Sequence, residues 1–165
     1  MKKIEIIFLD VDGVMTDGKK YIFENNIYKS FDVKDGAGIK KATQLGISVV
    51  ILTTDDWDTI YKRAEHLSIQ KVYTKCKNKL KIAQKYCLEK NISIENSCFI
   101  GDDINDKDLM KYVGLPACPK NAVREIKEIV SMRAGIISKK KGGDSCVRDI
   151  IEIIISRNDF LKELK

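Results

Sequence analysis

The chain has 165 residues, of which 44% are hydrophobic and 33% are charged, and its formal net charge is +6. These values are typical of one folded domain and exclude an intrinsically disordered chain. No apolar run reaches the roughly 18 to 20 residues that span a bilayer, and the run Ile4–Leu9 is too short for a signal peptide. We therefore expect one domain, residues 1–165, located in the cytoplasm and without a membrane partner.

The positive charge and the five cysteines indicate no specialised class of protein. The lysines are spread along the chain, and the densest run, Lys139–Lys141, is three residues long. This pattern fits a solvated surface better than a nucleic-acid interface, and it also suits an anionic substrate. The cysteines form no C-x-x-C pair and His66 is the one histidine, which argues against a zinc site and against a disulfide framework. We expect five buried free thiols.

Strand-like and helix-like segments alternate along the chain. Ile4–Leu9 is predicted to be a buried strand. The segments Tyr21–Phe23 and Ile27–Phe31 flank the turn residues Glu24-Asn25-Asn26 and predict a β-hairpin. The remaining predicted elements are, in chain order, a helix at Gly36–Leu45, a strand at Ile47–Leu52, a helix at Trp57–Leu67, a strand at Lys71–Tyr73, a helix at Lys79–Lys90, a strand at Ser97–Ile100, helices at Asp106–Val113 and Ala122–Val130, a strand at Gly135–Ile137 and a helix at Ser145–Arg157.

This order of elements predicts an α/β fold. Strands that alternate with helices of about ten residues imply right-handed crossovers and a parallel sheet covered by helices on both faces. We expect a three-layer, doubly wound, Rossmann-like sheet with a small β-hairpin, and such sheets bind ligands at the carboxyl ends of their strands. The polar residues that fall at or near those ends are Asp10, Asp12, Thr53, Thr54, Lys79, Asp102, Asp103, Asn105 and Asp106.

These residue types predict phosphoryl transfer at a metal ion. Several carboxylates in one crevice remain ionised together only if a cation accompanies them. Oxygen ligands without histidine or cysteine nearby favour magnesium, which takes one or two carboxylates plus the substrate phosphate. One aspartate can then act as a nucleophile and form an aspartyl-phosphate, while a second serves as general acid and base. A lysine and a threonine hydroxyl would neutralise and orient the phosphoryl oxygens.

The sequence resembles the haloacid dehalogenase superfamily over essentially its whole length. Four motifs carry the resemblance, namely the D-x-D-G-V-x-T-D-G run at Asp10–Gly18, the threonine Thr53, the lysine Lys79 and the G-D-D-x-N-D run at Gly101–Asp106. Any one of these motifs alone would be a weak signal, whereas together they are highly specific. The resemblance implies the haloacid dehalogenase fold, a phosphoric monoester hydrolase activity and Mg²⁺ as cofactor.

The resemblance also implies a role for each motif residue. Asp10 would be the nucleophile and a magnesium ligand, and Asp12 would be the general acid and base, with its backbone carbonyl on the metal. Asp102 would be a further metal ligand. The residues that would hold the phosphoryl group are Thr53 and Lys79, and those that would support the metal site are Asp103, Asn105 and Asp106.

Some of these assignments have alternatives in the sequence itself. Lys79 is chosen by its position from a lysine-rich segment, and Thr53 is preferred to Thr54 by the family pattern. Asn105 and Asp106 could also cap the following helix, and they could do so while serving the site.

The distances between motifs leave no room for the cap domain that many members of the superfamily carry. Only 40 residues separate Asp12 from Thr53, and only 25 separate Thr53 from Lys79. The chain resembles the capless phosphatases of 3-deoxy-octulosonate 8-phosphate and of nine-carbon keto-deoxy sugar acids. The runs Phe31–Ile39 and Lys141–Arg148 match this subgroup. Since those proteins are tetramers in which the hairpin and a neighbouring subunit cover the site, the resemblance implies a homotetramer and a phosphorylated sugar acid as substrate.

The second motif departs from the octulosonate enzymes, which usually continue it as threonine-glycine-arginine. This chain has Thr53-Thr54-Asp55 instead. An acidic third residue resembles the nine-carbon enzymes, which also have a downstream arginine and lysine. Arg63 matches that arginine, but His66 stands in place of the lysine and could equally be an ordinary, partly exposed histidine. The acidic residue therefore favours a nonulosonate 9-phosphate, although the missing glycine and the missing lysine leave the octulosonate open. The candidate substrate-binding residues are Thr53, Thr54, Asp55, Arg63, His66 and Lys79.

Two other classes of function remain open from the sequence. A phosphoacceptor signalling module also combines a parallel sheet with aspartates, a threonine and a lysine around magnesium. Such a module would not need Asp12 or the Gly101–Asp106 run, and its phosphoacceptor usually follows a later strand. A catalytically quiet scaffold or nucleic-acid binder would use the positive charge alone. Turnover of p-nitrophenyl phosphate with magnesium separates these functions from a phosphatase.

Overall fold

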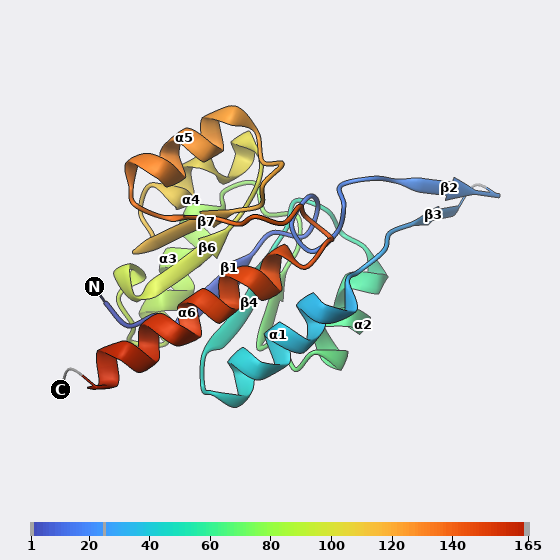
Figure 1. Ribbon diagram of the computed structural model, residues 1–165. Helices are drawn as coiled ribbons and strands as arrows, with labels where there is room; N and C mark the ends of the chain where they lie inside the picture. The colour runs from blue at the N-terminus through green and yellow to red at the C-terminus, as the bar shows by residue number, and fades with distance from the viewer. Residues whose placement is uncertain (1, 25, 164–165) are drawn as a thin grey trace.

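The computed structural model describes residues 2–24 and 26–163. Its centre is a sheet of six parallel strands in the order β5-β4-β1-β6-β7-β8 (Figure 1). The strands are β1 (Ile6–Leu9), β4 (Ser48–Leu52), β5 (Lys71–Tyr73), β6 (Ser97–Ile100), β7 (Leu115–Cys118) and β8 (Ile136–Ile137). The chain moves from β1 to one edge of the sheet and then returns to β6 on the other side of β1. The carboxyl ends of β1, β4 and β6 therefore surround the switch point at which such sheets bind ligands.

Helices cover both faces of this sheet. The helices are α1 (Val33–Gln44), α2 (Asp58–His66), α3 (Lys79–Glu89), α4 (Lys107–Met110), α5 (Arg124–Met132) and α6 (Cys146–Glu163), with 3₁₀ turns at Ile94–Asn96 and Ile104–Asp106. Buried side chains of α1, α2 and α6 pack in one core cluster, and those of α3, α4 and α5 pack in a second cluster on the opposite face. The predicted three-layer, doubly wound α/β fold is confirmed.

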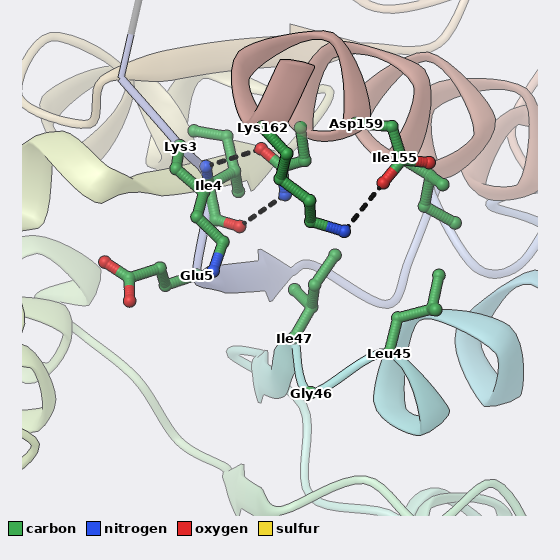
Figure 2. A pocket seen from close by; sticks show the side chains of 10 residues that line it. Lys3, Ile4, Glu5, Leu45, Gly46, Ile47, Ile155, Asp159 and Lys162 are labelled. Atoms are coloured by element: carbon green, nitrogen blue, oxygen red, sulfur yellow. Dashed lines mark hydrogen bonds and ion pairs between the residues drawn. The ribbon is translucent and has the colours of Figure 1, made fainter. Parts of the chain in front are cut away.

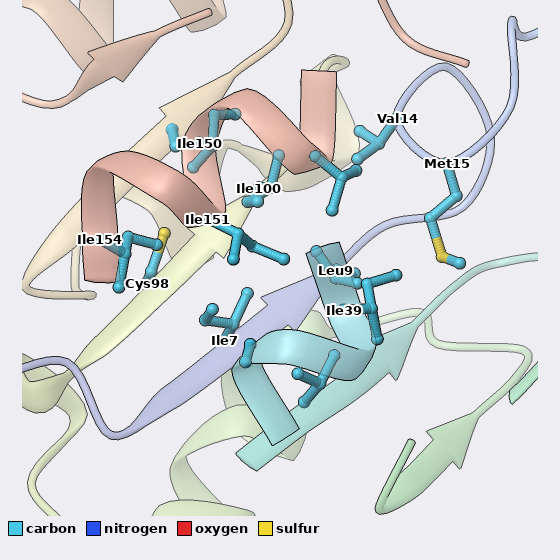
Figure 3. Close-up of a cluster of buried hydrophobic side chains, with 14 of the residues drawn as sticks. Ile7, Leu9, Val14, Met15, Ile39, Cys98, Ile100, Ile150, Ile151 and Ile154 are labelled. Carbon is cyan, nitrogen blue, oxygen red and sulfur yellow. The ribbon is translucent and has the colours of Figure 1, made fainter. Parts of the chain in front are cut away.

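The central strands are apolar on both faces because each face is covered. In β1, Ile7 and Leu9 belong to the core cluster of α1 and α6, whereas Ile6 and Phe8 belong to the cluster on the other face. All four side chains are fully buried. Figure 3 shows the first cluster, in which Ile151 of α6 lies over the strand residues. Each such side chain contributes about 1.5–3 kcal/mol through burial, which explains the unbroken apolar runs in the sequence.

Asn158 of α6 fastens the segment that leads into β1. Its buried side-chain amide donates to the Ile4 carbonyl at 2.8 Å and accepts from the Ile4 N–H at 2.9 Å. An unpaired buried backbone group costs about 1–3 kcal/mol, so this pair of bonds stabilises the docking of α6. The pocket beside it, at the amino-terminal edge of the sheet, has a volume of about 80 Å³ (Figure 2). Ligand sites usually have volumes of about 300–1,000 Å³, so we assign no ligand to this pocket.

The predicted hairpin consists of β2 (Tyr21–Phe23) and β3 (Asn26–Tyr28), which pair antiparallel and project away from the sheet (Figure 1). The predicted turn residue Asn25 lies outside the described residues. The apolar side chains that the hairpin exposes are Tyr21, Ile22, Phe23, Ile27 and Tyr28. Among the described residues between Asp12 and Lys79, the structure contains the hairpin, α1, β4, α2 and β5 but no cap domain, as the motif spacing predicts.

The sequence does not predict β7, because Pro116 interrupts its short apolar run and proline is rare inside sheets. The structure shows why the proline is tolerated. The Ala117 carbonyl accepts from the Gly101 N–H, which lies on the side of β6. Because the backbone polar groups of successive strand residues point to opposite sides, those of Pro116 point toward β8. β8 pairs with Ala117 and Cys118 and so begins after Pro116. The N–H that the proline lacks is therefore not needed for pairing with β8.

Several helix boundaries differ from the predicted ones because of local capping. α1 begins at Val33 rather than Gly36, since the Asp32 carboxylate accepts from the N–H groups of Lys34 and Asp35. The predicted helix at Asp106–Val113 is instead a 3₁₀ turn at Ile104–Asp106 followed by the four-residue α4. At the end of the chain, α6 continues past the predicted Arg157 to Glu163.

The five cysteines are all buried and unpaired, as expected from their spacing. Of the helices in the described part of the chain, none has both the length and the apolar character that a membrane crossing requires.

Candidate active site

A crevice of about 310 Å³ lies at the carboxyl ends of the central strands. Its volume falls in the range of small-molecule sites. The residues that line it are Asp10, Asp12, Gly13, Gly18, Lys20, Thr54, Asp55, Asp102, Asp103 and Asn105. Thr53, Lys79 and Asp106 are buried and lie outside this lining. The sheet thus brings most of the sequence-predicted residues to one place.

Asp10 and Lys79 form the buried centre of the site. The Lys79 ammonium lies 3.0 Å from one carboxylate oxygen of Asp10 and 2.6 Å from Asp106, and the other Asp10 oxygen accepts from the Val11 N–H at 2.7 Å. Burial alone would lower the pKa of Lys79, but the charges of these two carboxylates raise it. Lys79 therefore stays cationic and is the lysine that reaches the Asp10 side chain.

The acidic groups of the site fit a bound cation. Asp10, Asp102 and Asp106 each place a carboxylate oxygen within 4.8 Å of the others. Burial and then the charge of Asp106 raise the pKa of Asp10 to about 7, and burial and then the charge of Asp10 raise the pKa of Asp102 to about 8. One Asp102 oxygen is buried without a hydrogen-bond partner among the described residues. Because all these donors are oxygens, the set suits a hard divalent ion such as magnesium.

Asp106 and Gly13 explain two features of the motifs. The buried Asp106 carboxylate accepts from the backbone N–H groups of Asp102 at 2.8 Å and Asp103 at 3.3 Å, while its other oxygen binds Lys79. Asp106 therefore both caps the turn and positions the lysine. Gly13 has a φ of +80°, and a Cβ there would collide with the Asp102 carboxylate. The glycine after the two aspartates is thus required by backbone conformation and by space.

Thr53 and Thr54 have different environments. Thr53 is buried at the end of β4, and its hydroxyl accepts from the Asp55 N–H at 3.2 Å. Thr54 is exposed and lines the crevice. The structure therefore brings both threonines to the site, with Thr53 in its inner wall and Thr54 at its mouth.

Lys29 is a site residue that the sequence analysis did not single out. It directly follows β3, and its side chain is only 3% exposed. Its ammonium forms ion pairs with Asp12 and, at 2.8 Å, with Asp55, and it lies 4.3 Å from the centre of the Trp57 ring. The Trp57 indole N–H also donates to Asp55, at 2.7 Å. No sequence signal separates Lys29 from the many other lysines, because its partners are distant in the chain.

The two carboxylates that share Lys29 differ in their pKa. Burial raises the pKa of Asp12 above its ordinary value in spite of the lysine. For Asp55, burial acts in the same direction, but hydrogen bonds with Lys29, Asp12 and Trp57 outweigh it and lower the pKa to about 2. Asp55 and Lys29 therefore form a stable ion pair, and Asp12 is the carboxyl that holds a proton more readily.

Arg63 and His66 lie away from the crevice of their own chain. The Arg63 guanidinium donates to the Asp32 carbonyl at 3.0 Å, stacks 5.4 Å from the centre of the Phe31 ring and packs against Gly36. His66 is exposed in the last turn of α2. Neither side chain lines the crevice, so within one chain the structure does not bring them to the predicted substrate site.

The two runs that resemble the capless subgroup contact each other. In these runs, Ser145 donates to the Asp32 carboxylate at 3.1 Å, and the Arg148 N–H donates to Asp35 at 2.8 Å. The Gly143 N–H donates to the carbonyl of Val14, at 3.0 Å, in the loop of the first motif. The C-terminal run therefore supports the loop that carries the two aspartates.

Comparison with known proteins identifies the family. Residues 55–143 match the haloacid dehalogenase-like hydrolase family. The chain is also 34% identical, over 166 residues, to the 3-deoxy-D-manno-octulosonate 8-phosphate phosphatase KdsC of Escherichia coli (strain K12), across 99% of this chain and 86% of that protein. The chain belongs to the haloacid dehalogenase-like hydrolase family. The predicted family membership is confirmed.

Solved structures of other members of this family have the same fold. The 3-deoxy-D-manno-octulosonate 8-phosphate phosphatase of Yersinia pestis matches with a TM-score of 0.89 and 30% identity, over 96% of this chain and 84% of that one. The Moraxella catarrhalis enzyme of the same name, solved with a magnesium ion, a phosphate ion and a KDO molecule, matches with a TM-score of 0.88 and 25% identity, over 98% and 94%. The haloacid dehalogenase fold predicted from the motifs is thus confirmed.

Proposed function

We propose that the protein is a magnesium-dependent phosphatase that hydrolyses the phosphate monoester of a 3-deoxy-2-keto sugar acid. The observation that carries this proposal is the meeting of Asp10, Lys79 and Asp102 at one edge of the sheet. This arrangement offers a nucleophile, a fixed cation and an unpaired carboxylate oxygen around one position. The Escherichia coli relative, which is similar over 99% of this chain, is a phosphatase, and the similar Moraxella catarrhalis enzyme was solved with a magnesium ion. We assign the activity to residues 1–165 as one catalytic domain.

In the first half of the reaction, a carboxylate oxygen of Asp10 attacks the phosphorus and forms an aspartyl-phosphate. The bond between phosphorus and the sugar oxygen breaks, and Asp12 gives its proton to that oxygen as it leaves. Burial raises the pKa of Asp12 above its ordinary value, which is the direction that favours a general acid. Lys79 and the Thr53 hydroxyl hold the phosphoryl oxygens during the transfer.

In the second half, Asp12 acts as a base. It takes a proton from a water molecule whose oxygen bonds to phosphorus, while the bond from phosphorus to Asp10 breaks and inorganic phosphate leaves. Asp10 and Asp102 would hold magnesium, and the ion would supply positive charge that offsets the carboxylates and the phosphate. Asp106 keeps Lys79 and the loop of the fourth motif in place through both steps.

For the substrate, we propose 3-deoxy-D-manno-octulosonate 8-phosphate first and a nonulosonate 9-phosphate second. The similarity to the Escherichia coli and Yersinia pestis enzymes supports the first. The second rests on Asp55, which lines the crevice where the octulosonate enzymes usually have an arginine. Thr54 and Asp55 would contact the substrate from this chain. Arg63 and His66, which lie outside this crevice, would do so from a neighbouring subunit.

A phosphatase assay tests the proposed activity. With Mg²⁺, we expect turnover of p-nitrophenyl phosphate and a higher kcat/KM for octulosonate 8-phosphate than for nonulosonate 9-phosphate or glucose 6-phosphate. Removal of the metal with EDTA should abolish turnover, and added Mg²⁺ should restore it. A stable phosphorylated protein without turnover would instead indicate a phosphoacceptor module. Absence of both turnover and phosphorylation would leave only the scaffold class.

We also propose a homotetramer in which the hairpin joins the subunits, because a two-stranded ribbon is marginal alone and this one exposes Ile22 and Phe23. Light scattering should give four times the chain mass of 18.8 kDa. Replacing both residues with serine should dissociate the assembly and reduce activity on the sugar phosphate. Leu88→Ser, which removes an even more exposed apolar side chain from α3, should do neither.

A fully active monomer would contradict the proposed assembly. Within the tetramer, Arg63→Ala should raise KM for a sugar-acid phosphate, whose carboxylate an arginine can pair, and leave p-nitrophenyl phosphate turnover nearly unchanged. An equal loss on both substrates would show that Arg63 supports the fold rather than binding the sugar.

A further inference from the structure

Lys29 differs from every neighbouring hairpin side chain that the structure describes. Tyr21, Ile27 and Tyr28 point to the surface, whereas the Lys29 side chain is 3% exposed. Burying an ammonium group is costly unless other groups replace its hydration. Here two carboxylates and the face of an indole ring surround it. We call these four residues, Asp12, Lys29, Asp55 and Trp57, the lysine clamp.

The clamp is held in place from several elements. Asp55 follows β4, and one of its oxygens accepts both from the Lys29 ammonium, at 2.8 Å, and from the Trp57 indole N–H, at 2.7 Å. Its backbone N–H is bound to the Thr53 hydroxyl in the inner wall of the site. Lys29 is therefore fixed relative to β4, although it belongs to the hairpin segment.

Asp12 depends on this fixed ammonium for its orientation. Its side chain is 35% exposed on the loop after β1. Its carboxyl group is hydrogen-bonded to the Lys29 ammonium and to the Asp55 carboxyl, and Lys29 is itself bound to Asp55. An acid that must reach the leaving oxygen of a substrate works only in a narrow range of positions. The clamp therefore restricts the positions of this carboxyl group, which lines the crevice.

We infer that Lys29 is a positioning residue that orients Asp12 toward the leaving group. Because Lys29 directly follows β3, it also couples the position of the hairpin to the proton-transfer step. The inference rests on the proposed phosphatase function. It differs from a purely structural ion pair in one respect that can be measured, because a structural role would affect all substrates alike. In the first turnover, before water attacks the intermediate, a role through Asp12 affects only those substrates whose leaving group needs a proton.

The test compares the parent protein with Lys29→Met, Asp12→Asn and the double variant, all with Mg²⁺. Single-turnover release of the sugar from octulosonate 8-phosphate should fall by roughly 10- to 100-fold in Lys29→Met, as for a misplaced catalytic group. The first turnover of p-nitrophenyl phosphate should fall much less. In the Asp12→Asn background, Lys29→Met should cost nothing further, because the group it orients is already lost. Equal losses on both substrates, or losses that add in full, would overturn the inference.

A second measurement is independent of activity. Trp57 is the single tryptophan of the chain and lies directly against the Lys29 ammonium, so its fluorescence reports on the clamp. Lys29→Met should shift the Trp57 emission, whereas Lys19→Met, which removes an exposed charge before the hairpin, should leave it unchanged. An unchanged emission in Lys29→Met would refute the clamp. A shift in a protein without phosphatase activity would instead refute the proposed function and leave the clamp standing.

Loss of a buried lysine can also impair folding, and chemical rescue separates that effect from loss of orientation. Lys29→Ala leaves a space that n-propylammonium can fill. Added propylammonium should restore part of the lost rate on the sugar phosphate, and tetramethylammonium, which has no N–H to donate, should not. Absence of rescue in a protein with unchanged circular dichroism would contradict the positioning role.

Discussion

Asp10→Asn is expected to abolish turnover of every phosphate ester while the fold survives. The asparagine side chain has nearly the same volume and can still accept from the Val11 N–H, but it cannot attack phosphorus. Loss of a nucleophile lowers kcat by roughly 10⁴-fold or more. Steady-state assays with p-nitrophenyl phosphate and with the sugar phosphate check this, and Asp56→Asn, an exposed aspartate paired with Lys75, is the matched control with expected normal activity.

Thermal unfolding provides the second half of this prediction. The pKa of Asp10 is raised from 3.8 to about 7, so the folded protein favours the neutral carboxyl group. The stability that this preference contributes is fully present at low pH and is lost as the pH rises from 3.8 to about 7. At pH 8 without metal, Asp10→Asn should therefore unfold at a temperature no lower than the parent protein. Turnover near the parent level would rule out Asp10 as the nucleophile. A much lower unfolding temperature would show that loss of activity reflects loss of the fold.

Asp12→Asn is expected to slow the release of a sugar by roughly 100- to 10,000-fold, the usual effect of losing a general acid. A sugar alkoxide leaves only with a proton, whereas p-nitrophenolate leaves without one. The first turnover of p-nitrophenyl phosphate should therefore remain fast in this variant. Rapid-mixing measurements of product release on the two substrates give this comparison.

The same variant should accumulate the aspartyl-phosphate. Without Asp12 as the base, attack of water on the intermediate slows, so p-nitrophenol should appear in a burst that equals the enzyme concentration and then slowly. Equal loss on both substrates and no burst would show that Asp12 serves in metal binding or in folding. The control variant is Lys19→Met, because Lys19 is exposed and does not line the crevice, whereas the neighbouring Lys20 does.

The chain alone determined much of the active site. The aspartates of the first motif and the run Gly101–Asp106 each lie within a few residues and follow an apolar strand. Strands buried on both faces have unbroken apolar runs, and parallel strands end at a common edge. The positions of Asp10, Asp12 and Asp102 in one crevice therefore follow from local patterns plus one rule of topology.

Other features depended on contacts between distant segments. β7 carries a proline that is tolerated only because β8 begins beyond it. Asp106 acts both as a cap and as the partner of Lys79, and Arg63 is bound to Asp32 within its own chain. Lys29 looks like any other lysine in the sequence, and its role appears only where β4 and the loop after β1 meet it.

The difference between the features that the sequence determined and those that only the tertiary structure decided has a physical reason. Strand and helix preferences, capping and the spacing of motif residues are properties of neighbours in the chain, so the sequence determined them. The environment of an ionisable side chain depends on burial and on charges that arrive from elsewhere in the fold. Only the tertiary structure could decide that, of two aspartates sharing Lys29, Asp55 is held as an anion with a pKa of about 2 while the pKa of Asp12 is raised.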